Sequence, residues 1–255
     1  MSASNSMTAA EFGHGLRVIT ARELAAYFDS TIAYVYTIAF LLLSHSIFMN
    51  DFFLAGVVDM SGYFELLPLL LVFFVPAVTM RLWAEERKHR TAELLLTLPV
   101  TPIQAVLGKY LAALTLYGLF LAGSLPIVVM LLALGDPDLG LIFSGYLGLF
   151  LFGSLFLAFG EFFSSLTSEQ IVAFVAATLL GCILLLTGNA GVVAVLDGLW
   201  PSFALGTLLY ESVSVMPHYE AFVRGAVRLD SLAYFFGCSA VFLWMNAFVL
   251  ERDRG

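Results

Sequence analysis

The chain has 255 residues, of which 61% are hydrophobic and only 12% are charged, and its formal net charge is −8. A soluble globular domain carries roughly a quarter charged residues, so this composition excludes that class. The acidic residues are scattered and no basic face exists to collect phosphates, which argues against binding of nucleic acid.

Six apolar runs in the chain are long enough to cross a membrane as helices. A spanning helix needs about 20 residues at a rise of about 1.5 Å each. We expect spans near residues 31–50, 61–83, 105–134, 141–164, 168–196 and 229–250. These runs take up nearly the whole length, so the sequence predicts an all-α polytopic membrane protein with one domain, residues 1–255.

The positions of the basic residues predict which side of the membrane each loop faces. Of the eleven Lys and Arg residues, two precede the first span, five lie in residues 81–109 around the loop between the second and third spans, and two follow the last. The positive-inside rule makes this side cytoplasmic. Both chain ends are then expected inside, and residues 199–230, which contain Arg224 and Arg228, are expected outside.

Residues 16–30, just before the first span, predict a helix that lies in the cytoplasmic interface. Its apolar residues fall on one arc and its charged residues on the other side. The arc holds Val18, Ala21, Leu24, Ala25 and Phe28, and the polar side holds Arg22, Glu23 and Asp29. An ordinary juxtamembrane segment with snorkelling arginines fits the pattern equally well.

The most informative segment is residues 84–104, between the second and third spans. The sequence TPIQ at 101–104 is a capping box with proline at the first helical position, so a helix should begin there. Before it, the apolar run ELLLTL at 93–98 needs lipid, self-packing or a partner protein to cover it, and charges of both signs surround it. The predicted contact residues are Glu85, Glu86, Arg87, Arg90, Thr91, Glu93, Leu94, Leu95 and Leu98. The alternative is a solvated connector held on the membrane surface.

A second turn on the same side, residues 164–170, contains another predicted capping box, TSEQ at 167–170. Its predicted contact residues are Ser165, Thr167, Glu169 and Gln170. Two such turns facing one compartment could touch one partner, although turns of this composition are also common as plain connectors.

The long segment 199–230 predicts a short amphipathic or re-entrant helix at the outer leaflet, with an external lid loop as the alternative. From Tyr219 onward, Phe222, Ala226 and Leu229 can share one helical face. The charged side chains Glu220, Arg224 and Arg228 would lie elsewhere.

No catalytic motif or metal site is recognisable. Residues 103–110 lack the first glycine and the Ser or Thr of a phosphate loop, so we expect no nucleotide site, no cofactor and no enzymatic activity in the chain itself. Glu65 and Glu161 fall near span ends, where headgroup water should reach them, and we assign them no transport role.

Taken together, these stretches resemble the type-2 ABC-transporter permease family, and within it the gliding-motility-associated and copper-site-maturation permeases. Four stretches carry the resemblance, at residues 22–35, 85–112, 163–174 and 218–235. The second is the most specific. Arg90 stands where the family usually has glycine, so the turn into Thr91 is expected to be built differently.

The resemblance implies a six-helix permease subunit in a bacterial cytoplasmic membrane, which pairs with a second permease chain and docks a dimer of ABC ATPases that bind ATP and Mg. The coupling helix would be the region 85–98, and the turn 164–170 would be a second contact. Arg22, Glu23 and Phe28 would belong to the interfacial helix, and Tyr219, Glu220 and Arg224 to the outer re-entrant segment. The complex would export a substrate or transmit force, with a large extracytoplasmic partner as a further expectation. The rival hypothesis is a secondary transporter that works alone, which would need intramembrane charges and broken helices.

Overall fold

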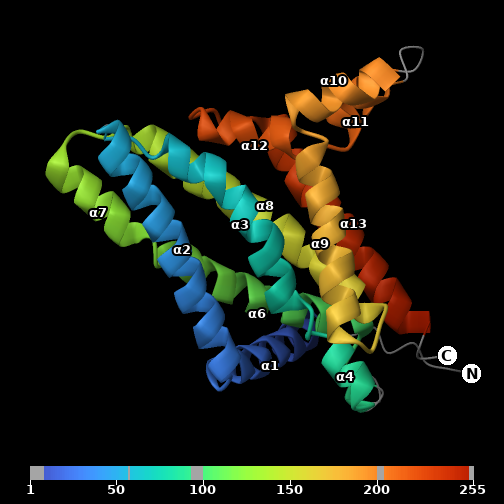
Figure 1. Ribbon diagram of the computed structural model, residues 1–255. Helices are drawn as coiled ribbons and strands as arrows, with labels where there is room; N and C mark the ends of the chain where they lie inside the picture. Colours follow the sequence, from blue (N-terminus) through green and yellow to red (C-terminus); the bar gives the residue numbers. More distant parts are fainter. Residues whose placement is uncertain (1–8, 57, 93–99, 200–203, 253–255) are drawn as a thin grey trace, which may run out of the picture.

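The computed structural model describes residues 9–56, 58–92, 100–199 and 204–252, and all regular structure in these ranges is helical (Figure 1). The helices are α1 (Ala9–Phe28), α2 (Thr31–Ala55), α3 (Ser61–Thr79), α4 (Ala84–Lys88), α6 (Pro102–Ala122), α7 (Leu125–Leu134), α8 (Leu139–Ser165), α9 (Gln170–Leu186), α10 (Ala190–Leu199), α11 (Leu205–Ser212), α12 (Met216–Val223) and α13 (Leu229–Arg252).

Five helical stretches are long and apolar enough to span a membrane, and a bent pair, α9 with α10, makes up to six. The chain is therefore an all-α, multi-pass membrane protein, as predicted. The five stretches are Thr31–Leu54, Ser61–Lys88, Pro102–Leu134, Leu139–Ser165 and Leu229–Arg252.

The fifth predicted span, 168–196, is not one straight helix. α10 turns away from α9 by 84°. The break falls at residues 187–189, where the side-chain oxygen of Asn189 accepts the backbone N–H of Gly191 at 2.9 Å and caps the new helix. The predicted span therefore consists of two helices at a sharp angle, which by length and composition form a broken span or a re-entrant pair.

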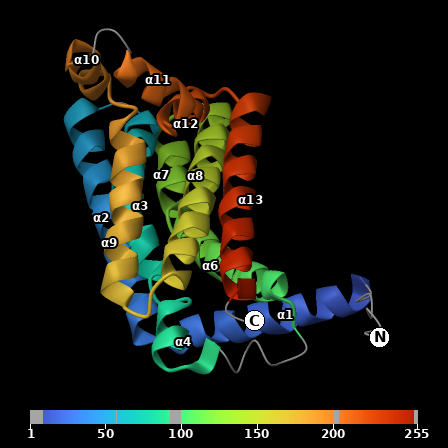
Figure 2. The same cartoon turned by 90° about the vertical axis from the view of Figure 1, so that its right-hand side faces the viewer.

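α8 lies at the centre of the bundle, in contact with α3, α6, α9, α12 and α13. α1 runs across one end of the bundle instead of along it, and α4 lies beside it (Figure 2). We call this the α1 end. The opposite end carries α10, α11 and α12, and we call it the α10 end (Figures 1 and 2).

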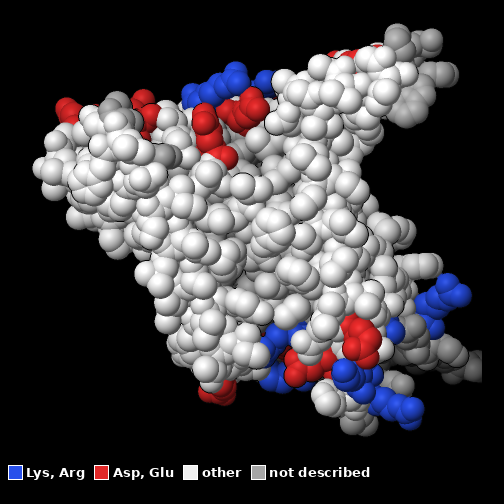
Figure 3. Space-filling view, viewed as in Figure 1, with Lys and Arg blue, Asp and Glu red and all other residues white. Residues whose placement is uncertain are grey.

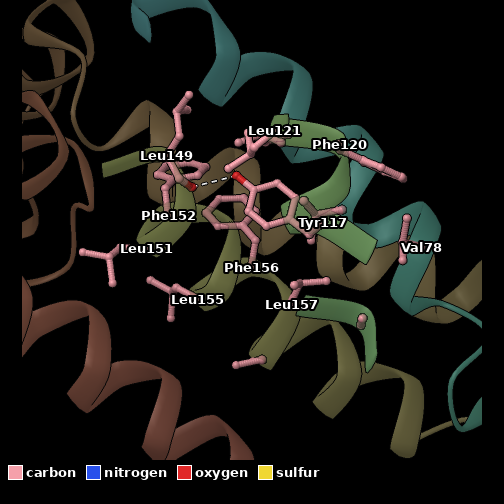
Figure 4. Close-up of a cluster of buried hydrophobic side chains, with 14 of the residues drawn as sticks. Val78, Tyr117, Phe120, Leu121, Leu149, Leu151, Phe152, Leu155, Phe156 and Leu157 are labelled. Atoms are coloured by element: carbon pink, nitrogen blue, oxygen red, sulfur yellow. Dashed lines mark hydrogen bonds between the residues drawn. The ribbon is translucent and has the colours of Figure 1, made fainter. Parts of the chain in front are cut away.

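The core is aromatic and tightly packed where α6 meets α8 (Figure 4). The Tyr117 hydroxyl donates to the carbonyl of Leu149 at 2.7 Å, which satisfies the only polar atom of a buried ring. Gly153 lies directly against this ring, and a Cβ there would collide with it. Phe152 and Phe156 stack with ring centroids 4.3 Å apart. The Phe152–Phe156 stack lies within α8, whereas the Tyr117 bond and the Gly153 contact pack α6 closely against α8, and such close packing makes the two helices a rigid pair.

The N-terminal helix differs from its predicted form. α1 already begins at Ala9 and buries a different face, with Ile19 and Tyr27 packed inward. Two members of the predicted apolar arc, Val18 and Phe28, are 53% and 44% exposed. The predicted apolar arc is therefore on the exposed side of α1, because the opposite face packs on α6, and its placement in the membrane interface stays a prediction.

The predicted helical face from Tyr219 to Leu229 is also wrong. α12 ends at Val223, and Gly225 takes a left-handed φ of 83° that stops the helix. Tyr219 and Phe222 are fully buried, and the Tyr219 hydroxyl donates to the carbonyl of Phe64 at 2.6 Å. α12 is thus packed into the bundle, which does not fit an external lid.

Candidate functional site

The residues predicted to carry mechanism meet around one buried lysine at the α1 end. Lys109 of α6 is only 1% exposed, and its Nζ lies 2.8 Å from Glu86 Oε1 and 3.1 Å from Glu23 Oε1. The same Nζ lies 4.9 Å from the centroid of the Trp83 ring. A buried ammonium is stable only when it is paired in this way. We call Arg22, Glu23, Trp83, Glu86 and Lys109 the charged junction.

The charged junction joins α1 to α4 electrostatically. Arg22 lies 2.5 Å from Glu23 and 3.5 Å from Glu86, so the two carboxylates share two cations. Burial alone would raise the pKa of Glu23, but Lys109 and Arg22 outweigh it and hold that pKa below its ordinary value. One turn along α1, burial raises the pKa of Tyr27 above its ordinary value. Glu23 and Tyr27 of α1 therefore face the bundle.

A second set of bonds ties the segment between α3 and α4 to α8. The Ser164 hydroxyl accepts the backbone N–H groups of Trp83 and Ala84 at 3.0 and 3.1 Å and donates to the carbonyl of Met80 at 2.9 Å. The Trp83 indole donates to Glu161 Oε1 at 2.9 Å. Since one hydroxyl serves three backbone groups, a displacement of α4 must pass to α8.

The expectation that headgroup water reaches Glu161 is wrong, because this side chain is fully buried. Its other oxygen has no hydrogen-bond partner in the described part of the chain, and neither has the fully buried amide of Asn246. α8 and α13 pack closely here, which closes the path to the membrane surface.

The two predicted contact regions lie side by side. Lys88 at the end of α4 is 3.4 Å from Glu169, which precedes α9, and both side chains are more than half exposed. The predicted capping box at 167–170 is wrong, because α9 begins only at Gln170 and Thr167 instead accepts the N–H of Glu169 at 3.1 Å. Ser165 turns inward and donates to the carbonyl of Phe162 in its own helix.

The capping box at Thr101 is confirmed, with both reciprocal bonds present at the start of α6. The Gln104 amide also donates to the carbonyl of Phe12 at 3.0 Å, so the same box holds α1. Of the other predicted contact residues, Glu85, Glu86 and Arg87 belong to α4. Glu93, Leu94, Leu95 and Leu98 lie outside the described residues.

Arg90 has a left-handed φ of 57°, the conformation that glycine suits best. The arginine adopts the left-handed geometry itself, and whether the turn into Thr91 differs from that of glycine-containing relatives stays a prediction. The Thr91 hydroxyl donates to the carbonyl of Glu86 at 3.3 Å and closes the turn.

A cleft of about 510 Å³ opens between α1 and α4 beside the charged junction. Arg22, Tyr27, Arg81, Glu85 and His89 are among the residues that line it. Charges of both signs gather at this end of the molecule (Figure 3). The surface suits an external protein with polar side chains more than it suits an apolar ligand.

The predicted outer residues do not join this site. Tyr219 is buried at the α10 end, and Glu220 forms an exposed ion pair with Arg224 at 2.8 Å. The sequence analysis missed Lys109, Trp83 and Ser164. The signal for Lys109 was available, because it is a single base at the eighth position of an apolar helix, where a charge must find a partner.

In the described ranges, no group of three or more His, Cys, Asp or Glu side chains could hold a metal ion. Comparison with known families gives a match to the family model described as ABC-2 family transporter protein, over residues 54–248. This range runs from the end of α2 to near the end of α13 and includes α4, Lys109 and Ser164. No curated protein matches the chain.

Proposed function

Since the chain belongs to the ABC-2 family of transporter proteins and is a membrane subunit of an ABC transporter, we propose that it couples ATP hydrolysis by a cytoplasmic ABC ATPase to movement of a substrate. The ATP and Mg are bound by the ATPase, and this chain supplies the membrane path. The observation that carries the proposal is the buried bridge from Lys109 to Glu86 and Glu23.

The α1 end faces the cytoplasm in this proposal. Arg17 and Arg22 of α1, Arg81 and Lys88 all belong to segments at that end, and the positive-inside rule places such segments inside. Both chain ends are then cytoplasmic, and the membrane is the inner membrane of a bacterium.

The ATPase docks on α4, on the residues that follow it and on the turn before α9. The exposed pair Lys88 and Glu169 supports one continuous docking surface. A push on α4 reaches α6 through Glu86 and Lys109, and it reaches α8 through Ser164. Since α6 and α8 form a rigid pair, the push rotates them as one body.

A second permease chain completes the transporter, and the rotation opens a path between the two chains. Export is the direction that fits the resemblance to type-2 permeases. A large extracytoplasmic partner would meet the α10 end, where α10 packs chiefly on α11 and little else holds it.

The test is co-expression of the chain with its ABC ATPase and purification through a tag on the permease. Replacing Leu94 and Leu95 with Asp should abolish co-purification and transport-coupled ATP turnover, since two charges would stand in the apolar anchor. Leu208→Asp, at an exposed apolar position on α11, is the matched control and should leave both intact. Unchanged assembly and turnover in the double variant would disprove the docking assignment.

Two observations favour a secondary transporter as the alternative. Glu161 is a buried intramembrane carboxylate, and the α9–α10 pair is a broken helix. This alternative predicts that the chain alone, in proteoliposomes with an ion gradient and no ATPase, moves substrate. Transport that requires the ATPase and ATP would exclude it.

A further inference from the structure

α3 runs between α2 and α9 (Figure 1), and one of its faces is exposed. Leu69 and Phe73 on this face are 56% and 48% exposed, whereas most of α3 is buried. Glu65, Leu69, Phe73, Ala77 and Met80 follow one another at intervals of four, four, four and three residues, so they form one stripe along the helix. We call this stripe and its walls the α3 groove.

Two cavities lie along the α3 groove. The one nearer the α1 end has about 330 Å³ and is lined only by apolar and aromatic side chains, including Tyr36 of α2, Phe73 and Phe174 of α9. The one nearer the α10 end has about 860 Å³. It shares Leu69 with the stripe and adds Leu186 of α9.

The cavity near the α10 end carries charge of one sign. Glu65, Asp197 and Glu220 line it, and no Lys or Arg is found among its described lining residues. Acidic side chains sit in a hollow near this end, and the surface between them and the α1 end is free of charge in this view (Figure 3).

The three carboxylates are not equally available. Asp197 accepts hydrogen bonds from Gly206 and Thr207, and Glu220 is paired with Arg224. Glu65 makes no hydrogen bond or ion pair within the described ranges, and its residue is exposed. Of the three carboxylates, Glu65 is thus the one that is free to pair with a charge on a ligand.

We propose that the α3 groove binds the transported molecule, and that this molecule is a cationic amphiphile. Its apolar chain lies against Leu69 and Phe73, and its positively charged headgroup pairs with Glu65. The proposal rests on the transport function proposed above and names the substrate class.

The dimensions agree with an amphiphile. From Glu65 to Met80 the stripe is about 22 Å long at the helical rise, whereas one leaflet of the hydrocarbon core is about 15 Å thick. The stripe is therefore long enough to take an acyl chain that spans one leaflet, with the headgroup at Glu65. Burial of such a chain against the apolar lining is favourable in proportion to the area that is buried. The Glu65 carboxylate favours a positively charged headgroup over a negatively charged one.

The test measures equilibrium binding to the purified full chain in detergent, without ATPase, of two fluorescent probes that share one dodecyl chain. One probe carries a trimethylammonium headgroup and the other a sulfate. We expect the cationic probe to bind about tenfold more tightly, and Glu65→Gln should remove most of that preference. Glu211→Gln, an exposed acid on α11 that does not line the cavity, is the matched control and should keep the preference.

Phe73→Ala should weaken both probes to a similar degree, because it removes apolar wall and no charge. Equal binding of the two probes, or a preference that survives Glu65→Gln, would overturn the proposal. Disulfides between two copies of Phe73→Cys that form equally well with and without saturating cationic probe would also overturn it, since a second chain and not the probe would then fill the groove. None of these results depends on ATPase capture, so they separate this proposal from the docking proposal.

Discussion

The two ends of the bundle use their charges in opposite ways. At the α1 end, Lys109 is buried and bonds to Glu86, 23 positions away in sequence, and to Glu23 on another helix. At the α10 end, Arg224 bonds to Glu220 only four positions away, and both are exposed. Long-range buried pairs connect helices, whereas local exposed pairs stabilise only the turn that holds them. The α1 end should therefore move as one unit, and the α10 end should be free to rearrange.

The largest effect should come from removing the central cation. Lys109→Met would leave the partly buried Glu23 and Glu86 with only the half-exposed Arg22 as a partner, and we expect it to lower the free energy of unfolding by about 3 kcal/mol. Lys88→Met breaks an exposed pair with Glu169 and should cost less than about 1 kcal/mol. Chemical denaturation of the purified chain in detergent measures both. Similar losses for the two variants would contradict the contrast between buried and exposed pairs.

The hydroxyl that links α8 to α4 should rank second. Ser164→Ala removes one acceptor and one donor that serve three backbone groups, and we expect a loss of about 1–3 kcal/mol in the free energy of unfolding. Ser165→Ala is a matched control, because Ser165 is equally buried but bonds only within its own helix. If both variants denature at the same point, the bond between helices adds nothing to the junction.

The sequence predicted most of the spans and the start of α6, because long apolar runs and the capping box at Thr101 are local signals. It could not predict that Lys109 pairs with Glu23 and Glu86, since that choice depends on how three helices pack. Glu161 was misjudged for the same reason. Its position near a helix end indicates water, but the packing of α13 on α8 excludes it. The bend at Asn189 was missed although Thr187, Gly188 and Asn189 are a turn signal, because the apolar residues on both sides of it were taken as one run.

A smaller effect of opposite sign is expected at Arg90. Its left-handed φ of 57° is strained for a residue with a Cβ, so Arg90→Gly should stabilise the chain by about 1 kcal/mol. Arg87→Gly, inside α4, should instead destabilise by about 1 kcal/mol or more. The two midpoints of thermal unfolding should therefore move in opposite directions. A fall in both would mean that the Arg90 side chain makes contacts worth more than its strain.

The smallest effect on the whole molecule should come from the α10 end. Asp197 accepts the N–H of Gly206 at 2.6 Å and the hydroxyl of Thr207 at 2.7 Å, which fastens the first turn of α11 to α10. Asp197→Ala should speed hydrogen exchange of the backbone amides of residues 205–212. The midpoint of global unfolding should not move, because α10 packs chiefly on α11 and an opening there can stay local.

The effect of Asp197→Ala on hydrogen exchange should depend on pH. The hydrogen bond from the Thr207 hydroxyl is the main cause that holds the pKa of Asp197 below its ordinary value of 3.8. A carboxyl group whose pKa is lowered in the folded state stabilises that state above its unfolded pKa, and the contribution is lost as pH falls through the folded pKa. The difference in hydrogen exchange between the original chain and Asp197→Ala should thus be largest at neutral pH and disappear below pH about 3.8.

If Asp197→Ala also lowered the midpoint of global unfolding as far as Lys109→Met does, the α10 end would be coupled to the bundle as firmly as the α1 end. A local effect alone would show that the two ends differ, because the Asp197 bonds join only α10 to α11, whereas Lys109 joins α6 to both α1 and α4.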